Sequence, residues 1–223
     1  MKFQKYMAVG ILGLTMALGF SGCQSENQKN QDAYRKIGIN SMAEGDYDKA
    51  VKSFQKALDT SLGKIGAEEI DICYYKAAAQ FAKKDYDGAI ETYTSLIDYD
   101  KENANAYYLR GSVYLDTDKK DKAFKDYKNA VKYAGREYEI YEGIYENLTN
   151  KGETEEAKNY LKKALDIKPK DGADYAEQGH VYYLLEDYTQ AKSSLDRAID
   201  KDDKTALLYF CLLYTSDAAD DFI

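Results

Sequence analysis

The sequence of 223 residues contains no tryptophan, one proline and one histidine. The near absence of proline, the strongest breaker of helices, favours an all-α chain. The single histidine, His180, excludes a metal site built on two histidines and a histidine-paired Cys73 unless the partners come from elsewhere. Tryptophan is the side chain best suited to stacking on sugar rings, and its absence argues against a small-ligand or glycan receptor.

Cysteine is also scarce, with three residues at Cys23, Cys73 and Cys211. This number and spacing predict no disulfide framework. Cys73 lies among apolar residues of a predicted helix, and we interpret it as a buried free thiol. The 31 basic residues are outnumbered by 39 acidic ones, which gives a formal net charge of −8. Because an acidic chain does not attract a phosphate backbone, we predict no nucleic-acid partner.

Motifs that carry chemistry are absent as well. The sequence has neither a phosphate-binding loop nor a dinucleotide-binding glycine motif. The acidic stretch that begins at Asp116 resembles the start of a calcium loop, but it lacks the required glycine and the closing glutamate. We interpret it as a solvated turn. The sequence therefore predicts a protein that is not an enzyme and has no cofactor and no metal site.

Residues 1–22 have the pattern of a bacterial lipoprotein signal peptide. Lys2 and Lys5 precede an apolar stretch at residues 7–20, which is too short to span a membrane comfortably as a mature helix. The stretch ends in FSGC, which resembles a lipobox and implies that Cys23 is lipidated after cleavage. An ordinary signal peptide with an incidental cysteine is the alternative.

Residues 23–30 are then the lipidated cysteine and a polar, flexible tether. We therefore predict a lipid-anchored protein on the extracytoplasmic face of a cell membrane.

After the tether, one pattern recurs along the chain. GDYDKAVKSFQKALD (Gly45–Asp59), KDYDGAIETYTSLID (Lys84–Asp98) and EDYTQAKSSLDRAID (Glu186–Asp200) align, with two weaker copies between them. An alanine holds the same place in each copy, at spacings of 39, 34, 34 and 34 residues: Ala50, Ala89, Ala123, Ala157 and Ala191. A large apolar residue follows four positions later, which predicts an amphipathic helix that a second helix approaches closely.

A second amphipathic segment precedes each copy. Each carries an anchor residue: Tyr34, Cys73, Tyr107, Tyr141 or Tyr175. Four positions later a small residue follows in most copies, at Gly38, Ala77, Gly111 and Gly179, whereas the fourth copy has Tyr145 there. Turn residues separate the two segments, so the pattern predicts pairs of antiparallel helices.

This arrangement, Y-x₂-[IRQ]-G-x₂-[SY], a turn, then A-x₃-[FYL]-x₂-A, resembles the tetratricopeptide repeat. The resemblance implies an all-α fold, a right-handed superhelical solenoid of antiparallel helix pairs. We predict an array at residues 31–210 with a partial sixth unit from residue 206. Its five complete units are 31–64, 70–103, 104–137, 138–171 and 172–205. Residues 61–69 place five extra residues after the first unit.

The resemblance also implies a function. In that family the first helix of each unit lines a concave groove that holds peptides or partner helices, so the chain is expected to be an interaction scaffold with a protein or peptide partner. Positions beside the anchors give the candidate groove residues: Arg35, Tyr74, Tyr75, Tyr108, Glu142, Glu146, His180 and Tyr183. Glu177 and Phe81 lie on the same predicted surface. The alternative is that Tyr74, Phe81 and Tyr183 pack against the neighbouring unit.

The last thirteen residues, 211–223, break the repeat. Tyr209 falls in the anchor place of a sixth unit, but Leu213 holds the next small position. Cys211–Asp221 resembles the in-frame translation of a transposon-based sequencing adapter, so we expect this tail to be non-native; a diverged half-repeat is the alternative. A second hypothesis for function follows: the chain is the N-terminal adaptor part of a longer protein whose missing C-terminal region is catalytic or ligand-binding.

Overall fold

The structure is a computed structural model that describes residues 26–61, 63 and 65–201. The signal peptide at 1–22, Cys23, the partial sixth unit from residue 206 and the tail at 211–223 lie outside the described residues. The predictions made for them remain predictions.

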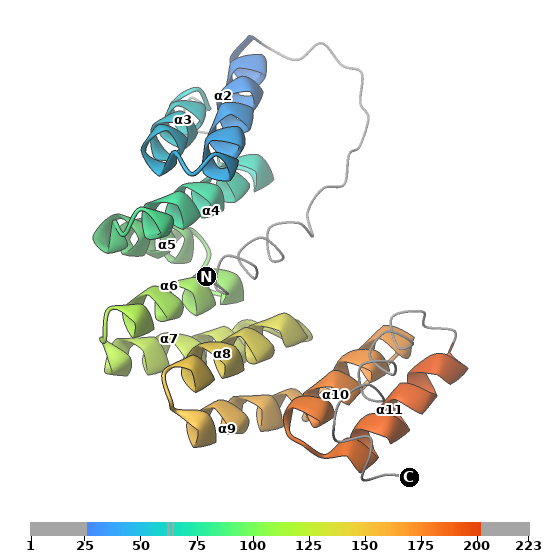
Figure 1. The fold of residues 1–223 in the computed structure, drawn as a ribbon. Helices are drawn as coiled ribbons and strands as arrows, with labels where there is room; N and C mark the ends of the chain where they lie inside the picture. Colours follow the sequence, from blue (N-terminus) through green and yellow to red (C-terminus); the bar gives the residue numbers. More distant parts are fainter. Residues whose placement is uncertain (1–25, 62, 64, 202–223) are drawn as a thin grey trace. The chain divides into compact units, whose positions relative to one another are not determined.

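The described residues form ten α-helices and no strand, in two compact units that divide after Tyr133. The first unit holds α2 (Glu26–Ala43), α3 (Tyr47–Asp59), α4 (Ala67–Ala82), α5 (Tyr86–Tyr99), α6 (Ala104–Asp116) and α7 (Lys120–Tyr133). The second unit holds α8 (Tyr138–Asn150), α9 (Thr154–Ala164), α10 (Gly172–Leu184) and α11 (Tyr188–Asp200). Each unit is a row of antiparallel helix pairs (Figure 1), so the prediction of an all-α helical repeat solenoid is confirmed.

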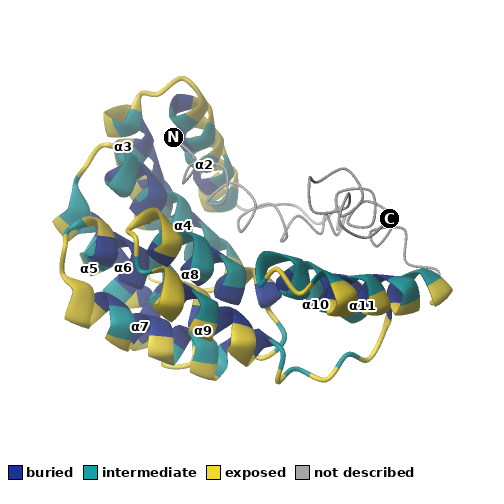
Figure 2. Ribbon diagram, turned by 60° about the horizontal axis from the view of Figure 1, so that its bottom comes forward, coloured by how far each residue is buried: buried dark blue, intermediate teal, exposed yellow. Residues whose placement is uncertain are grey.

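The predicted repeat positions form the core of each pair. All five repeat alanines, from Ala50 to Ala191, have an exposed fraction of 0%. The large residues four positions later are also buried: Phe54, Tyr93, Tyr127, Leu161 and Leu195. Figure 2 shows buried segments along the facing sides of the helices, with exposed segments mostly on the turns and outer faces. The close helix approach that the alanines predict is therefore present.

The small residues of the first helices lie directly against these large ones. A Cβ atom added at Gly111 would come within 2.8 Å of the Tyr127 ring, and one at Gly179 within 2.8 Å of Leu195 Cδ2. Contacts this short do not occur between real side chains, so a larger residue at either place would force the facing side chain to shift. The repeat pattern of a small residue opposite a large one is thus a packing requirement.

The turns inside the pairs share one backbone feature. Residues 45, 84, 118, 152 and 186 all have a positive φ, at the same spacing as the repeat alanines. Gly45 and Gly152 adopt this left-handed conformation at little cost. Lys84 adopts it too, although its Cβ atom makes the conformation unfavourable. In that turn, the N–H of Lys84 donates to the carbonyl of Phe81 and the N–H of Asp85 to that of Gln80, both at 2.8 Å. These bonds satisfy the last carbonyls of α4.

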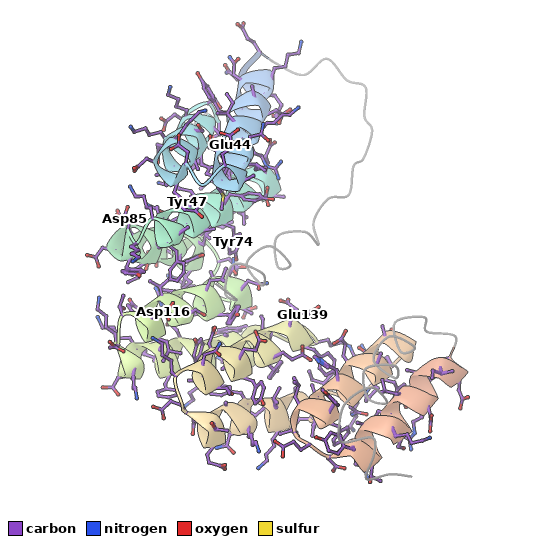
Figure 3. The ribbon with its side chains drawn as sticks, viewed as in Figure 1. Glu44, Tyr47, Tyr74, Asp85, Asp116 and Glu139 are labelled. Atoms are coloured by element: carbon purple, nitrogen blue, oxygen red, sulfur yellow. The ribbon has the colours of Figure 1, made fainter. Side chains whose placement is uncertain are left out.

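An aspartate often follows the left-handed residue and caps the second helix. The carboxylate of Asp46 accepts from the N–H of Lys49, and that of Asp85 accepts from the N–H of Gly88. Asp187 caps α11 in the same way. Figure 3 labels Glu44, Asp85 and Asp116, which lie at the helix ends and turns of the three pairs in the first unit. The turn and the cap together fix where each second helix begins.

The first helix is longer than the sequence predicted. Residues 26–30 belong to α2, although they were expected to be part of the flexible tether. Glu26 lies in the first turn of the helix, where a negative charge is favourable. Gln28 and Gln31 donate hydrogen bonds to Glu68 and Glu69 of α4. A polar composition alone did not reveal these partners.

The extra residues between the first two pairs also move a boundary. The helix α4 begins at Ala67, three residues before the predicted unit start at Ile70. The carboxylate of Glu69 accepts from the backbone N–H of Gly66 at 2.8 Å, which fixes this earlier start. Among the described residues, no helix is both long enough and apolar enough to cross a membrane.

Candidate functional site

The eight predicted groove residues divide between the two units. Arg35, Tyr74, Tyr75 and Tyr108 lie on α2, α4 and α6 of the first unit, and Glu142, Glu146, His180 and Tyr183 lie on α8 and α10 of the second. All eight are half-buried. Each group is described within its own unit.

Arg35 is held in place by α4. Its Nε donates to Oδ2 of Asp71 at 2.9 Å, and its Nη2 contacts the same oxygen. The guanidinium also lies 5.3 Å from the centre of the Tyr75 ring, a distance typical of a cation–π contact. Burial lowers the pKa of Arg35, but the hydrogen bond and the charge of Asp71 outweigh this and raise it. The guanidinium is therefore charged and fixed.

Tyr75 and Tyr74 take part in aromatic packing. The Tyr75 ring stacks on Phe54 with the ring centres 5.6 Å apart. The Tyr74 ring lies 6.3 Å from that of Tyr93, and its hydroxyl donates to Oδ1 of Asn103 at 2.6 Å. Asn103 is also the N-cap of α6, so the Tyr74 hydroxyl links α4 to the start of α6. The groove role and the packing role predicted as alternatives for Tyr74 both remain predictions.

Hydrogen bonds between polar side chains also join α2 to α4. Gln28, Gln31 and Arg35 of α2 pair with Glu68, Glu69 and Asp71 of α4. Burial and a hydrogen bond to Asp32 raise the pKa of Glu68 to about 6. With the Tyr74–Asn103 bond, these pairs place α2, α4 and α6 side by side. We call the half-buried residues Arg35, Tyr74, Tyr75 and Tyr108 on these helices the first-helix surface.

In the second unit the predicted residues converge on the only histidine. Nδ1 of His180 on α10 lies 2.9 Å from Oε1 of Glu142 on α8. Burial lowers the pKa of His180, but the hydrogen bond to Glu142 and the charges of Glu142, Glu177 and Glu146 together raise it. The His180 ring also stacks on Tyr183 with centres 6.4 Å apart. The structure therefore brings together residues that are 38 positions apart in the sequence.

Tyr183 and Phe81 each have a ring neighbour within their own pair. Tyr183 lies 5.9 Å from Tyr188, and Phe81 lies 5.6 Å from Tyr86. Tyr145 replaces the small residue of the fourth sequence repeat, residues 138–171. It is half-buried, and its hydroxyl donates to the carbonyl of Leu184 at 3.5 Å. Tyr145 therefore connects α8 to the end of α10. Cys73, predicted as a buried free thiol, is free and half-buried, and burial raises its pKa.

Sequence reasoning missed the residues that hold the predicted ones. Asp71 fixes Arg35 and Asn103 fixes Tyr74, yet neither belongs to the repeat pattern. Sequence reasoning also missed two hydrogen bonds, of 2.7 and 2.9 Å, that Arg110 on α6 donates to Asp126 on α7. A signal was available for Asp71, because an acidic residue 36 positions after Arg35 lies close to one repeat away.

Two family models match the chain. The model described as "Tetratricopeptide repeat" matches residues 32–61, 104–136, 146–171 and 175–204, which together are more than half of the chain. The model described as "TPR repeat" matches residues 77–118. The match in the fourth sequence repeat begins at residue 146 and omits most of α8, the helix in which Tyr145 departs from the repeat pattern.

Two curated relatives are similar to parts of the chain. "Anaphase-promoting complex subunit 3" of Schizosaccharomyces pombe is 21% identical over 220 residues, which is 86% of this chain. "Tetratricopeptide repeat protein 13" of Homo sapiens is 27% identical over 154 residues, 64% of this chain. The chain spans only 33% and 17% of the lengths of these two relatives.

A solved structure from the functional characterization of Pseudomonas aeruginosa pilF aligns with a TM-score of 0.50 and 17% identity. The alignment covers 89% of this chain and 98% of that chain. This likeness shows a shared fold.

Proposed function

Because the chain belongs to the tetratricopeptide repeat family, we propose that it is a protein-interaction scaffold that binds a peptide or partner protein through its first-helix surface. The binding function is supported by the family and by the name of one relative, which is a subunit of a multiprotein complex. We propose no catalytic role for the chain.

One observation carries the proposal: the aromatic and charged side chains of the first-helix surface are fixed before any partner arrives. The Tyr75 ring stacks on Phe54 and contacts the Arg35 guanidinium, and Asp71 in turn holds Arg35. Fixed aromatic and arginine side chains are the best anchors at protein interfaces, because binding does not have to order them. Their half-buried state leaves part of each side chain open to a partner.

The partner-binding test compares tyrosines on and off this surface. Tyr108→Ala and Tyr75→Ala remove aromatic groups from the surface, whereas Tyr99→Ala removes an exposed tyrosine of α5, whose exposed fraction is 55%. Each full-length variant is used to recover partners from an extract of the cell envelope, after circular dichroism has shown that it is folded. We expect about tenfold lower recovery with the first two changes and unchanged recovery with Tyr99→Ala. Equal recovery by all three variants contradicts the proposed surface.

We also propose that the scaffold is anchored by lipid at Cys23 on the extracytoplasmic face of a membrane. The support is the lipobox-like end of the apolar stretch at residues 7–20. Cys23→Ser is expected to release the protein from the membrane into the soluble extracytoplasmic fraction, because one acyl-bearing anchor is lost. Continued fractionation of the Cys23→Ser protein with membranes rules out the lipid anchor.

A further inference from the structure

Three side chains able to bind a metal ion converge in the second unit. They are Glu142 on α8 and Glu177 and His180 on α10, and one ligand atom from each lies within 4.8 Å of the others. Over residues 26–61 and 65–201, this is the one group of three such side chains that meets this distance. The group combines an imidazole with two carboxylates from separate helices, so it is more than a cluster of acidic residues.

The spacing of the three residues suits a shared ion. Glu177 and His180 are three positions apart on α10 and so project from the same face of the helix. This Glu-x-x-His arrangement, completed by a glutamate from a facing helix, occurs in the metal sites of helical bundles.

The distances also suit one ion. Nδ1 of His180 and Oε1 of Glu142 are 2.9 Å apart. Two ligands that each lie about 2.0–2.2 Å from one ion are separated by roughly 3–4 Å. The 4.8 Å limit is wider than this, so a glutamate oxygen moves closer when all three atoms bind one ion.

The charge balance favours a divalent cation over a proton. Glu146, one turn along α8 from Glu142, adds a third carboxylate whose charge acts on His180. One protonated imidazole offsets a single negative charge among these three carboxylates, whereas a divalent ion offsets two. The side chains are partly shielded from water, with 24% of His180 and 19% of Glu142 exposed. This shielding strengthens the attraction and still leaves a path for the ion and for water ligands.

We propose that Glu142, Glu177 and His180 form a binding site for a divalent first-row transition metal ion. An imidazole nitrogen favours zinc, copper, iron or nickel over magnesium and calcium, which prefer oxygen ligands alone. The bound ion joins α8 to α10, and so it links the fourth helix pair to the fifth and stabilises the second unit. This role goes beyond the proposed binding of a partner protein.

The test is the binding of zinc to the full-length chain, prepared without a histidine tag. Calorimetric titration at mildly alkaline pH, where protons compete less with the ion for the imidazole, is expected to show one saturable site per chain. Zinc is also expected to raise the melting temperature, because it binds the folded state. His180→Asn and Glu177→Gln are each expected to weaken zinc binding at least about tenfold.

The matched control is Glu155→Gln, which removes one negative charge from an exposed position on α9 of the same unit. Glu155→Gln is expected to bind zinc as the unchanged chain does. Cobalt(II), as a coloured substitute for zinc, gives an absorption band that should change in His180→Asn, because a nitrogen ligand is lost.

Three results overturn the proposal. The first is an unchanged chain that shows no saturable zinc binding. The second is zinc binding by the folded His180→Asn and Glu177→Gln variants that is as tight as binding by the unchanged chain. The third is a loss of binding in Glu155→Gln as large as that in Glu177→Gln, since it would show attraction to the acidic surface in general.

Discussion

The ring of Phe54 fills the space beside Gly38: a Cβ atom added at Gly38 would come within 2.5 Å of Phe54 Cε1. Phe54 is fully buried and cannot move aside into solvent. The same relationship joins Gly111 to Tyr127 in the third helix pair and Gly179 to Leu195 in the fifth. The large side chain of the second helix packs directly against the glycine of the first helix, and this contact sets the distance between the two helices.

The contact predicts that Gly38→Ala destabilises the protein. Forcing a methyl group into this packing costs about 1–3 kcal/mol, and the higher helix propensity of alanine returns up to about 1 kcal/mol. We expect the free energy of unfolding to fall by about 1–2 kcal/mol, measured by urea denaturation followed by circular dichroism. In a Phe54→Leu background the same change should cost less; an equal cost in both backgrounds means that the two residues do not compete for space.

The pair between Arg110 and Asp126 predicts a second stability effect. Both side chains are largely buried, with exposed fractions of 15% and 4%, and Nη1 of Arg110 also donates to Thr94. Asp126→Asn leaves the buried guanidinium without a compensating charge, so the free energy of unfolding should fall by about 2–4 kcal/mol.

The control for this effect is the exposed pair of Lys101 and Asp98. These side chains are 67% and 66% exposed, so Asp98→Asn should change stability little. Urea denaturation of both variants measures the two effects. A loss in Asp126→Asn no larger than that in Asp98→Asn shows that the buried pair does not support the third helix pair.

Glu68 predicts a pH dependence of stability. Burial and the hydrogen bond to Asp32 raise the pKa of Glu68 from 4.5 to about 6. A raised pKa means that the folded state binds the proton more tightly than the unfolded state, so this contribution is complete below pH 4.5 and is lost as the pH rises through about 6. The α2–α4 contact should therefore weaken over this interval.

Glu68→Gln removes the titrating group and keeps the side-chain shape. We expect the difference in unfolding free energy between the unchanged chain and Glu68→Gln to shift in favour of the variant as the pH rises from 4.5 to about 6. Urea denaturation at a series of pH values measures this difference. A difference that stays constant over the interval shows that Glu68 titrates alike in the folded and unfolded states.

Much of the fold follows from local sequence signals. The helices α6 and α8 begin at Ala104 and Tyr138, where the third and fourth repeats were predicted to start. The prediction worked because the periodic alanines and small residues are the residues that pack the helices together. The start of α2 at Glu26 did not follow, since its glutamines are held by residues about 40 positions away. The positive φ of Lys84 did not follow from its residue type either, because a lysine does not favour this conformation and only the equivalent positions Gly45 and Gly152 signal it.

The candidate site was predicted less completely than the fold. Periodicity identifies which residues lie beside the anchors, and so it placed Arg35 and His180 on the predicted groove side of the first helices. It does not show which side chains bind one another across helices. Asp71 holds Arg35, and Glu142 meets His180, through contacts that depend on the angle and offset between adjacent pairs. Those quantities are properties of the packed structure.

The central claim, that the first-helix surface holds a partner protein, is tested most directly by crosslinking from single positions. A photo-crosslinking aromatic amino acid is placed at Tyr108 on α6 or at Tyr99 on α5 in the full-length chain, and cells are irradiated. Adducts are detected by their mobility in gels and identified by mass spectrometry. The account predicts a discrete protein adduct from position 108 and none from position 99; adducts from position 99 with none from position 108 contradict it.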